Sequence, residues 1–176
     1  MRSVLSWLGF ASDDAASNTD TIHRIAAELD RLPPERARFI AAMAYVLSRV
    51  ARADHEVSAE ETAAMERLVA ERNHLPADQA ALVVQMAKTQ QLLFGGTDDF
   101  LVTRELAAMA TYEQKLALVD CLYAVASADR RILTGEADEI ARIGRELKID
   151  QADLSRLRSR HREFLAAREG LEPNAS

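Results

Sequence analysis

The chain has 176 residues, enough for one domain with a hydrophobic core and too few for two large domains. Hydrophobic residues make up 48% and charged residues 28%, which is typical of a globular protein and excludes a wholly disordered chain. The net charge of -6 argues against a protein that grips nucleic acid over its whole surface, and the single cysteine, Cys121, excludes an intramolecular disulfide and any multi-cysteine metal site.

Residues 1–18 form an N-terminal segment, amphipathic or flexible, for which two roles stay open. Residues 1–10 include Trp7 and Phe10, but no cleavage site follows them, so we do not expect a signal peptide. The segment could cap the core or lie on a membrane as a short amphipathic turn. No apolar run reaches the ~20 residues that cross a bilayer, and we expect a cytoplasmic protein.

Two helices are expected between residues 19 and 50. The first runs over about 19–31 and ends before Pro33-Pro34, because proline cannot continue a helix. The second starts near Pro34, where a first helical turn accepts proline. Its apolar residues follow spacings of three and four: Phe39, Ile40, Met43, Val46, Leu47 and Val50.

Capping signals mark the helices that follow. Ser58 with Glu61 forms a capping box for a helix ending near Asn73, and another helix then runs from about residue 78 to Gly95-Gly96. A short helix capped by Thr97 comes next.

A second capping box, Thr111 with Gln114, starts the helix that carries Cys121 as a small core residue. Two further helices are expected, over 134–147 and from Asp150 onward, and residues 170–176 form a flexible tail.

The chain also contains one stretch of sequence twice, and a constant shift in residue number superposes the two copies. This shift aligns Leu47, Val50, Asp54 and Glu61 with Leu122, Val125, Asp129 and Glu136. The copies cover about 36–75 and 111–150, and each reads as helix, acidic corner, helix. Since no segment alternates as a strand does, the sequence predicts an all-α domain over 19–169. We expect a single compact bundle of seven or eight helices with a pseudo-twofold helix-turn-helix repeat.

The two corners carry a recognisable motif. The first corner, residues 53–61, reads Ala-Asp-His-Glu-Val-Ser-Ala-Glu-Glu, and the second corner, residues 128–136, reads Ala-Asp-Arg-Arg-Ile-Leu-Thr-Gly-Glu. Both resemble the Ala-Asp-Gly-x-(Val/Ile)-x-x-x-Glu signature of the tellurite-resistance TerB family, and the chain is similar to that family over roughly 20–165. The signature also appears in membrane-anchored DnaJ-like co-chaperones. The chain departs from it at His55 and Arg130, where glycine, which accepts a positive φ, is usual.

The resemblance implies a cytoplasmic, all-helical, non-enzymatic protein that binds divalent metal through its acidic corners and works near membrane-associated stress complexes. The family's acidic positions fall on Asp54, Glu61, Asp129 and Glu136. Carboxylates suit hard cations, and we expect Ca²⁺ ahead of Mg²⁺ or Zn²⁺. Because Arg130 and Arg131 put two fixed cations beside Asp129, the first corner is the stronger metal candidate.

A simpler interpretation of the corners needs no ligand. Glu61 completes a capping box, Glu136 favours a helix N-terminus, and each Asp accepts backbone N–H groups. Two hypotheses therefore stay open. The chain is either a TerB-like, stress-linked adaptor that binds a divalent cation, or a structural interaction domain whose acidic turns only cap helices. Either one implies a protein partner and no nucleic acid, and in the second case the surface docks a partner helix or a membrane-associated complex.

No motif indicates an enzyme. The sequence has no phosphate-binding glycine loop and no nucleophile elbow, and the four histidines share no ligand spacing. His161 is expected to be a hydrogen-bonded core residue. The basic run of residues 156–162 straddles an apolar stripe and is typical of a solvated helix edge.

Overall fold

The computed structural model describes residues 16–50, 59–89, 99–128 and 130–165. All regular elements in these ranges are helical, apart from one isolated bridge between Ile132 and Leu165. The elements are α2 (Ala16–Asp30), α3 (Pro34–Val50), α4 (Ala59–Asn73), α5 (Ala77–Lys88), α7 (Asp99–Met109), α8 (Tyr112–Ala126), α9 (Thr134–Glu146), α10 (Gln151–Arg160) and the 3-10 helix η1 (Arg162–Phe164). The predicted all-α class is confirmed, with eight α-helices among the described residues.

Most of the predicted boundaries that can be compared agree with the structure. Thr111 caps α8 and Gln114 bonds back to it, so this capping box is confirmed. Helix α2 begins at Ala16, slightly before the predicted start. Two helices end earlier than predicted: α5 ends at Lys88 and not at Gly95-Gly96, and α10 ends at Arg160 and does not continue past His161. Ser58, Thr97 and Gly95-Gly96 lie outside the described residues.

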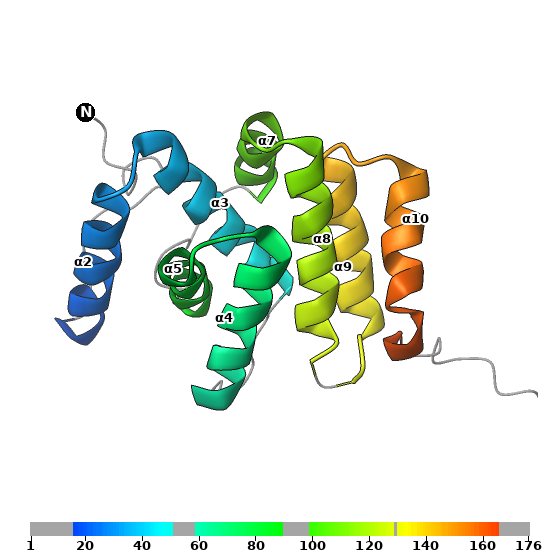
Figure 1. The fold of residues 1–176 in the computed structure, drawn as a ribbon, viewed down its shortest axis with the longest axis horizontal. Coiled ribbons are helices and arrows are strands. Elements are labelled where there is room, and N and C mark those ends of the chain that lie inside the picture. The colour runs from blue at the N-terminus through cyan, green and yellow to red at the C-terminus, as the bar shows by residue number, and fades with distance from the viewer. Residues whose placement is uncertain (1–15, 51–58, 90–98, 129, 166–176) are drawn as a thin grey trace, which may run out of the picture.

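Helix α3 runs through the middle of the molecule (Figure 1). It contacts α5, α7, α8 and α9. Helices α8, α9 and α10 stand side by side, and α4 packs on α5 and α8. Helix α2 and helix α10 lie at opposite ends of the long axis, so α3 links the two ends.

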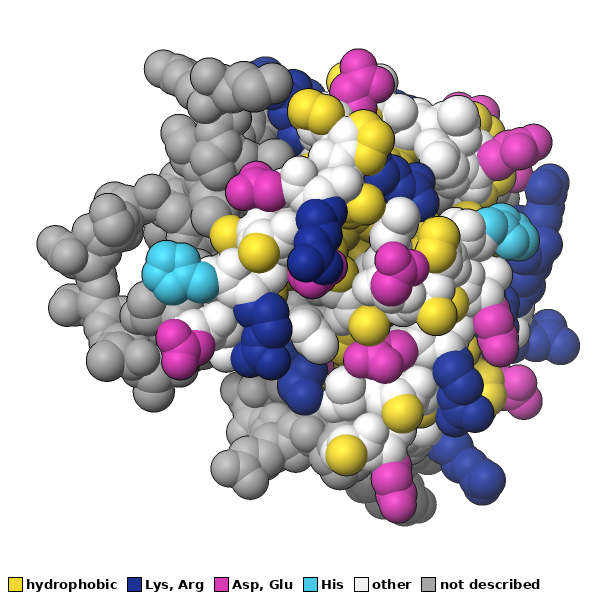
Figure 2. Space-filling model, turned by 60° about the vertical axis from the view of Figure 1, so that its left-hand side comes forward, with side chains coloured by type: hydrophobic (Ala, Val, Ile, Leu, Met, Phe, Trp, Pro, Cys, Tyr) yellow, Lys and Arg dark blue, Asp and Glu magenta, His cyan; other side chains and the backbone are white. Residues whose placement is uncertain are grey.

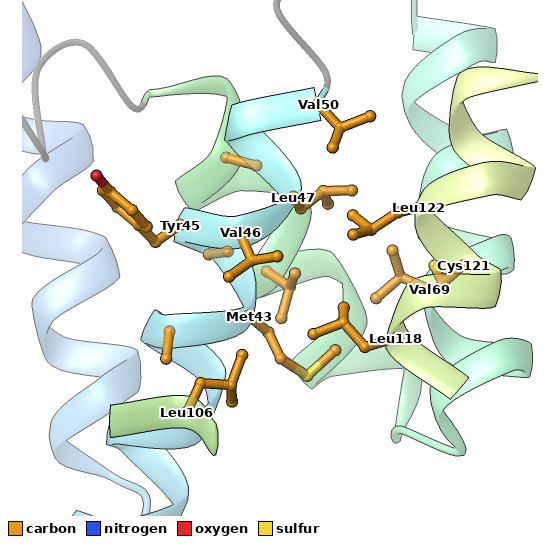
Figure 3. Packing of buried hydrophobic residues seen from close by; sticks show 14 of the residues in the cluster. Met43, Tyr45, Val46, Leu47, Val50, Val69, Leu106, Leu118, Cys121 and Leu122 are labelled. Carbon is orange, nitrogen blue, oxygen red and sulfur yellow. The ribbon is translucent and has the colours of Figure 1, made fainter. Parts of the chain in front are cut away.

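Part of the core lies where α3 meets α8, with Val69 of α4 beside them (Figure 3). Met43, Leu47 and Val50 of α3 face Leu118 and Leu122 of α8. Every residue from Ile40 to Val50 is buried, which explains why the apolar stripe of this helix is wide. This burial agrees with the position of α3, which contacts α2, α5, α7, α8 and α9.

The starts of corresponding helices in the two halves of the chain are separated by the same number of residues as the two copies of the repeated sequence. Helices α4 and α9 start at Ala59 and Thr134, two positions that the same offset aligns. Helix α3 contacts α9 as α8 contacts α4, the arrangement expected if the halves exchange by a twofold axis. Residues 51–58 lie outside the described part of the chain, so the two bends cannot be compared, and the pseudo-twofold repeat stays a prediction.

Candidate functional site

The acidic corners contribute two of the four predicted ligands to the described part of the structure. Glu61 and Glu136 lie in the first turns of α4 and α9, where a negative charge favours the helix N-terminus. Asp54 and Asp129 lie outside the described residues. Within the described ranges, no three side chains of the types His, Cys, Asp and Glu come together as a metal site would require.

Glu136 has a local task in the second corner. Its Oε2 accepts the backbone N–H of Leu133 at 2.8 Å, which satisfies one of the free donors at the start of α9. Arg130, in the same corner, has a φ of 60°, the left-handed conformation that glycine adopts without strain. Arg130 therefore adopts the left-handed backbone conformation that is expected from the glycine usual at this position in the family.

A buried cation links the helices that lead to and from the corners. The side chain of Arg49, at the end of α3, is 3% exposed. Its Nε donates to Glu139 at 2.8 Å, and its Nη1 donates to Glu146 at 2.7 Å and to Thr103 at 2.9 Å. Burial opposes the charged form, but the hydrogen bonds and charges of the two glutamates raise the pKa of Arg49 above its ordinary value.

A buried anion makes a second link, from α8 to α4 and to the turn after α10. Asp120 is 8% exposed, bonds Arg72 through Oδ2 and lies 3.1 Å from His161 Nε2 through Oδ1. The ring of His161 stacks on Tyr123 with centroids 5.4 Å apart. The hydrogen bond with His161 is the largest cause that lowers the pKa of Asp120. The prediction of a hydrogen-bonded core histidine is confirmed.

The only thiol of the chain is inert. Cys121 is buried beside Asp120, and burial raises its pKa to about 11. A thiol with this pKa is protonated at neutral pH and is a poor nucleophile. Its prediction as a core residue is confirmed.

One open groove, of about 450 Å³, lies between α2 and α5. Ile25, Leu32 and Leu82 form its apolar part, and its charged lining includes Arg24 and Asp78. The lining contains no Ser, Cys or His. On the described part of the face in Figure 2, acidic and basic side chains are interspersed. A continuous basic surface for nucleic acid is not seen there.

The networks of Arg49 and Asp120 were not predicted. A signal for them exists in the sequence, since each charged residue lies within a mostly apolar stretch, with Leu47 and Val50 near Arg49 and Val119 and Cys121 beside Asp120. A buried charge requires partners. Their identity could not be read, because Glu146 and His161 are far along the chain. No buried side-chain nitrogen or oxygen among the described residues lacks a hydrogen bond.

Comparison with known proteins gave one match. Residues 39–159 match the family described as "Tellurite resistance protein TerB". No significant match to a curated protein or to a solved structure was found. The matched region contains both corners, Arg49 and Asp120, whereas α2 and His161 lie outside it. Where the structure describes helices, none combines the length and the apolar character needed to cross a membrane.

Proposed function

Because the chain belongs to the TerB family, we propose that it is a non-enzymatic adaptor in tellurite resistance that binds a divalent cation at its acidic corners. The observation that carries the proposal is the family match over both corners. TerB is not a known enzyme family, and the described groove and buried networks hold no catalytic constellation. A binding role fits these residues better than a reaction does.

The donor chemistry of the corners fits a hard cation. Asp54, Glu61, Asp129 and Glu136 offer only carboxylate oxygens, the ligands that Ca²⁺ prefers. A bound cation would supply the positive charge that allows several carboxylates to approach one another. Glu136 keeps free lone pairs while it accepts the Leu133 N–H, because a carboxylate has about four acceptor positions.

Calcium titration of the full chain tests the proposal. Ca²⁺ should raise the melting temperature, since a ligand that binds only the folded state stabilises it. Glu61→Gln should weaken the effect. Glu60→Gln removes a neighbouring exposed carboxylate from the same first turn and should leave the effect unchanged. If neither calorimetry nor melting responds to Ca²⁺, the cation hypothesis is wrong.

The second candidate is a structural interaction domain whose acidic turns only cap helices. The 2.8 Å bond from Leu133 N–H to Glu136 favours it. Glu136→Gln separates the two roles, because a glutamine oxygen still accepts this N–H but carries no charge. Under the capping role, this variant keeps the hydrogen bond and loses only the attraction between the charge and the helix dipole, about 0.3–1 kcal/mol, whereas Glu136→Ala loses about 0.5–2 kcal/mol. Under the cation role, Glu136→Gln weakens calcium binding.

The adaptor role has a cellular test. In a tellurite-sensitive strain that lacks the protein, expression of the full chain should restore growth on tellurite. The variant Glu61→Gln should restore growth less well than Glu60→Gln if the first corner matters. Equal rescue by both would leave the protein with a role in resistance that does not use this carboxylate.

A further inference from the structure

Among the residues that the structure describes, one backbone bond joins the second corner to a distant part of the chain. Arg130 N–H donates to Ser127 at 2.8 Å and Leu133 N–H donates to Glu136, so both bonds stay within the local turn. The N–H of Ile132 instead donates to the carbonyl of Phe164, at 2.6 Å. Ile132 is fully buried, and a lost partner would leave a buried donor unsatisfied.

The segment that supplies this carbonyl is short and is held at its start. It comprises His161, η1 and Leu165, and we name it the strap. Phe164 N–H donates to the carbonyl of His161 at 3.0 Å, and Leu165 pairs with Ile132 in the isolated bridge. A single turn of 3-10 helix has little stability of its own, so the position of the strap depends on its side-chain contacts.

Phe164 and Leu165 of the strap pack against the hydrophobic core, and His161 supplies its polar contacts. It is 8% exposed, it meets the Asp120 carboxylate and it stacks on Tyr123, both of which belong to α8. Arg162 and Glu163, the next two residues, are exposed. Asp120 is held in turn by Arg72 of α4. A continuous set of contacts therefore runs from α4 through Asp120 and His161 to the backbone of the second corner.

We propose that His161 is a positioning residue, which locks the strap on Asp120 and so fixes the backbone of the second corner through the Phe164 carbonyl. The strap lies just beyond residues 39–159, which match the family. If the corner binds a cation, as proposed above, the strap fixes the conformation in which Glu136 and its neighbours are presented.

Amide hydrogen exchange on the full chain tests, without any ligand, whether His161 fixes the strap and the second corner. In the unchanged protein, the Ile132 amide should be protected as well as amides within α9. His161→Ala should reduce its protection by about tenfold or more, while the Val46 amide in α3 stays unchanged. His161→Gln, which keeps an N–H donor toward Asp120, should restore part of the protection. Arg162→Ala, an exposed change in the strap, should have no effect.

Two results would contradict the proposed positioning role of His161. The first is an unprotected Ile132 amide in the unchanged protein, which needs no variant to detect. The second is a loss of protection in His161→Ala that is the same at Ile132 and Val46, since that loss would be global. Calcium titration adds a separate arm. His161→Ala should weaken Ca²⁺ binding more than Arg162→Ala does, whereas a chain that never binds Ca²⁺ defeats the cation proposal and leaves the exchange result standing.

Discussion

The two buried networks hold comparable helix pairs with charges of opposite sign. Where α3 meets α9, the cation Arg49 lies between the carboxylates of Glu139 and Glu146. Where α8 meets α4, the anion Asp120 lies between Arg72 and His161. The first centre is closed, with its guanidinium 3% exposed, and the second opens to solvent through Arg72, whose side chain is 43% exposed.

The difference shows that the buried charged residues do not lie at equivalent positions in the two copies of the repeat. At the offset that aligns Leu47 with Leu122, Arg49 aligns with Ala124 and Asp120 aligns with Tyr45. Equivalent helix contacts are thus fixed by unrelated residues. If the halves descend from one unit, the apolar packing is what they share, and each interface has its own buried charges.

The largest effect is expected at the closed network. Arg49→Met leaves Glu139 and Glu146 without their buried partner, and removing one member of such a pair costs about 3–5 kcal/mol. Arg142→Met removes an exposed partner of Glu139 and should cost about 0–1 kcal/mol. Urea unfolding measures both. Equal losses would mean that burial does not distinguish these arginines.

The open network should give a smaller, pH-dependent effect. Asp120→Asn should cost about 1–3 kcal/mol at neutral pH, because the bonds to His161 and Arg72 lose their charge. The folded pKa of Asp120 lies below its ordinary value of 3.8, chiefly through His161. Its contribution is therefore present above pH 3.8 and is lost as the pH falls through the lower folded value.

Unfolding of both proteins across a pH series checks this sign. The difference in unfolding free energy between the unchanged chain and Asp120→Asn should be full at neutral pH and should shrink in acid. A difference that grows on acidification would show that Asp120 is not stabilised as the anion.

A third test concerns helix packing in the second half. Gly144 of α9 lies against the Leu154 side chain of α10, and a Cβ there would collide with it. At the offset of the repeat, the first half has Val69 at this position. Gly144→Ala should cost about 1–3 kcal/mol through overpacking. Gly135→Ala, where a Cβ meets open space, should be neutral or stabilising by up to about 1 kcal/mol.

Thermal unfolding of these two variants gives the comparison directly. If Gly144→Ala is as stable as Gly135→Ala, α10 can shift away at little cost. The contact between α9 and α10 would then be looser than the close approach at Gly144 indicates.

The smallest effect is expected at Arg130. Its φ of 60° is strained for any residue with a Cβ, so Arg130→Gly should gain up to about 1 kcal/mol. Arg130→Ala removes the same guanidinium but keeps the Cβ, and it should gain nothing. Chemical denaturation of both variants isolates the backbone contribution. A matching gain from His55→Gly would indicate that the first corner has the same left-handed turn.

Local features of the fold could be predicted because their signals are local. The Pro33-Pro34 break and the capping box of Thr111 and Gln114 lie within a few residues of the boundaries that they set. Periodicity also identified Cys121 and His161 as buried. The left-handed backbone at Arg130 was suggested by the glycine of the family motif.

The polar partners could not be predicted, because the fold brings them together over long separations. His161 could be assigned to the core but not to Asp120, and Arg49 could not be assigned to Glu146. Periodicity states which side of a helix is buried and does not state which helix faces it. Of the metal candidates, Glu61 and Glu136 were placed correctly at helix starts, while the joint cation site stays a prediction.

Because Cys121 is buried, its reaction with a thiol reagent can report opening of the protein core. A thiol reagent should modify this side chain only in molecules whose core has come apart, because the sulfur is enclosed and protonated in the folded state. With one thiol per chain, each labelling event records one opened molecule. The labelling rate would therefore measure how often the core of the native protein opens, without any attached dye or engineered residue.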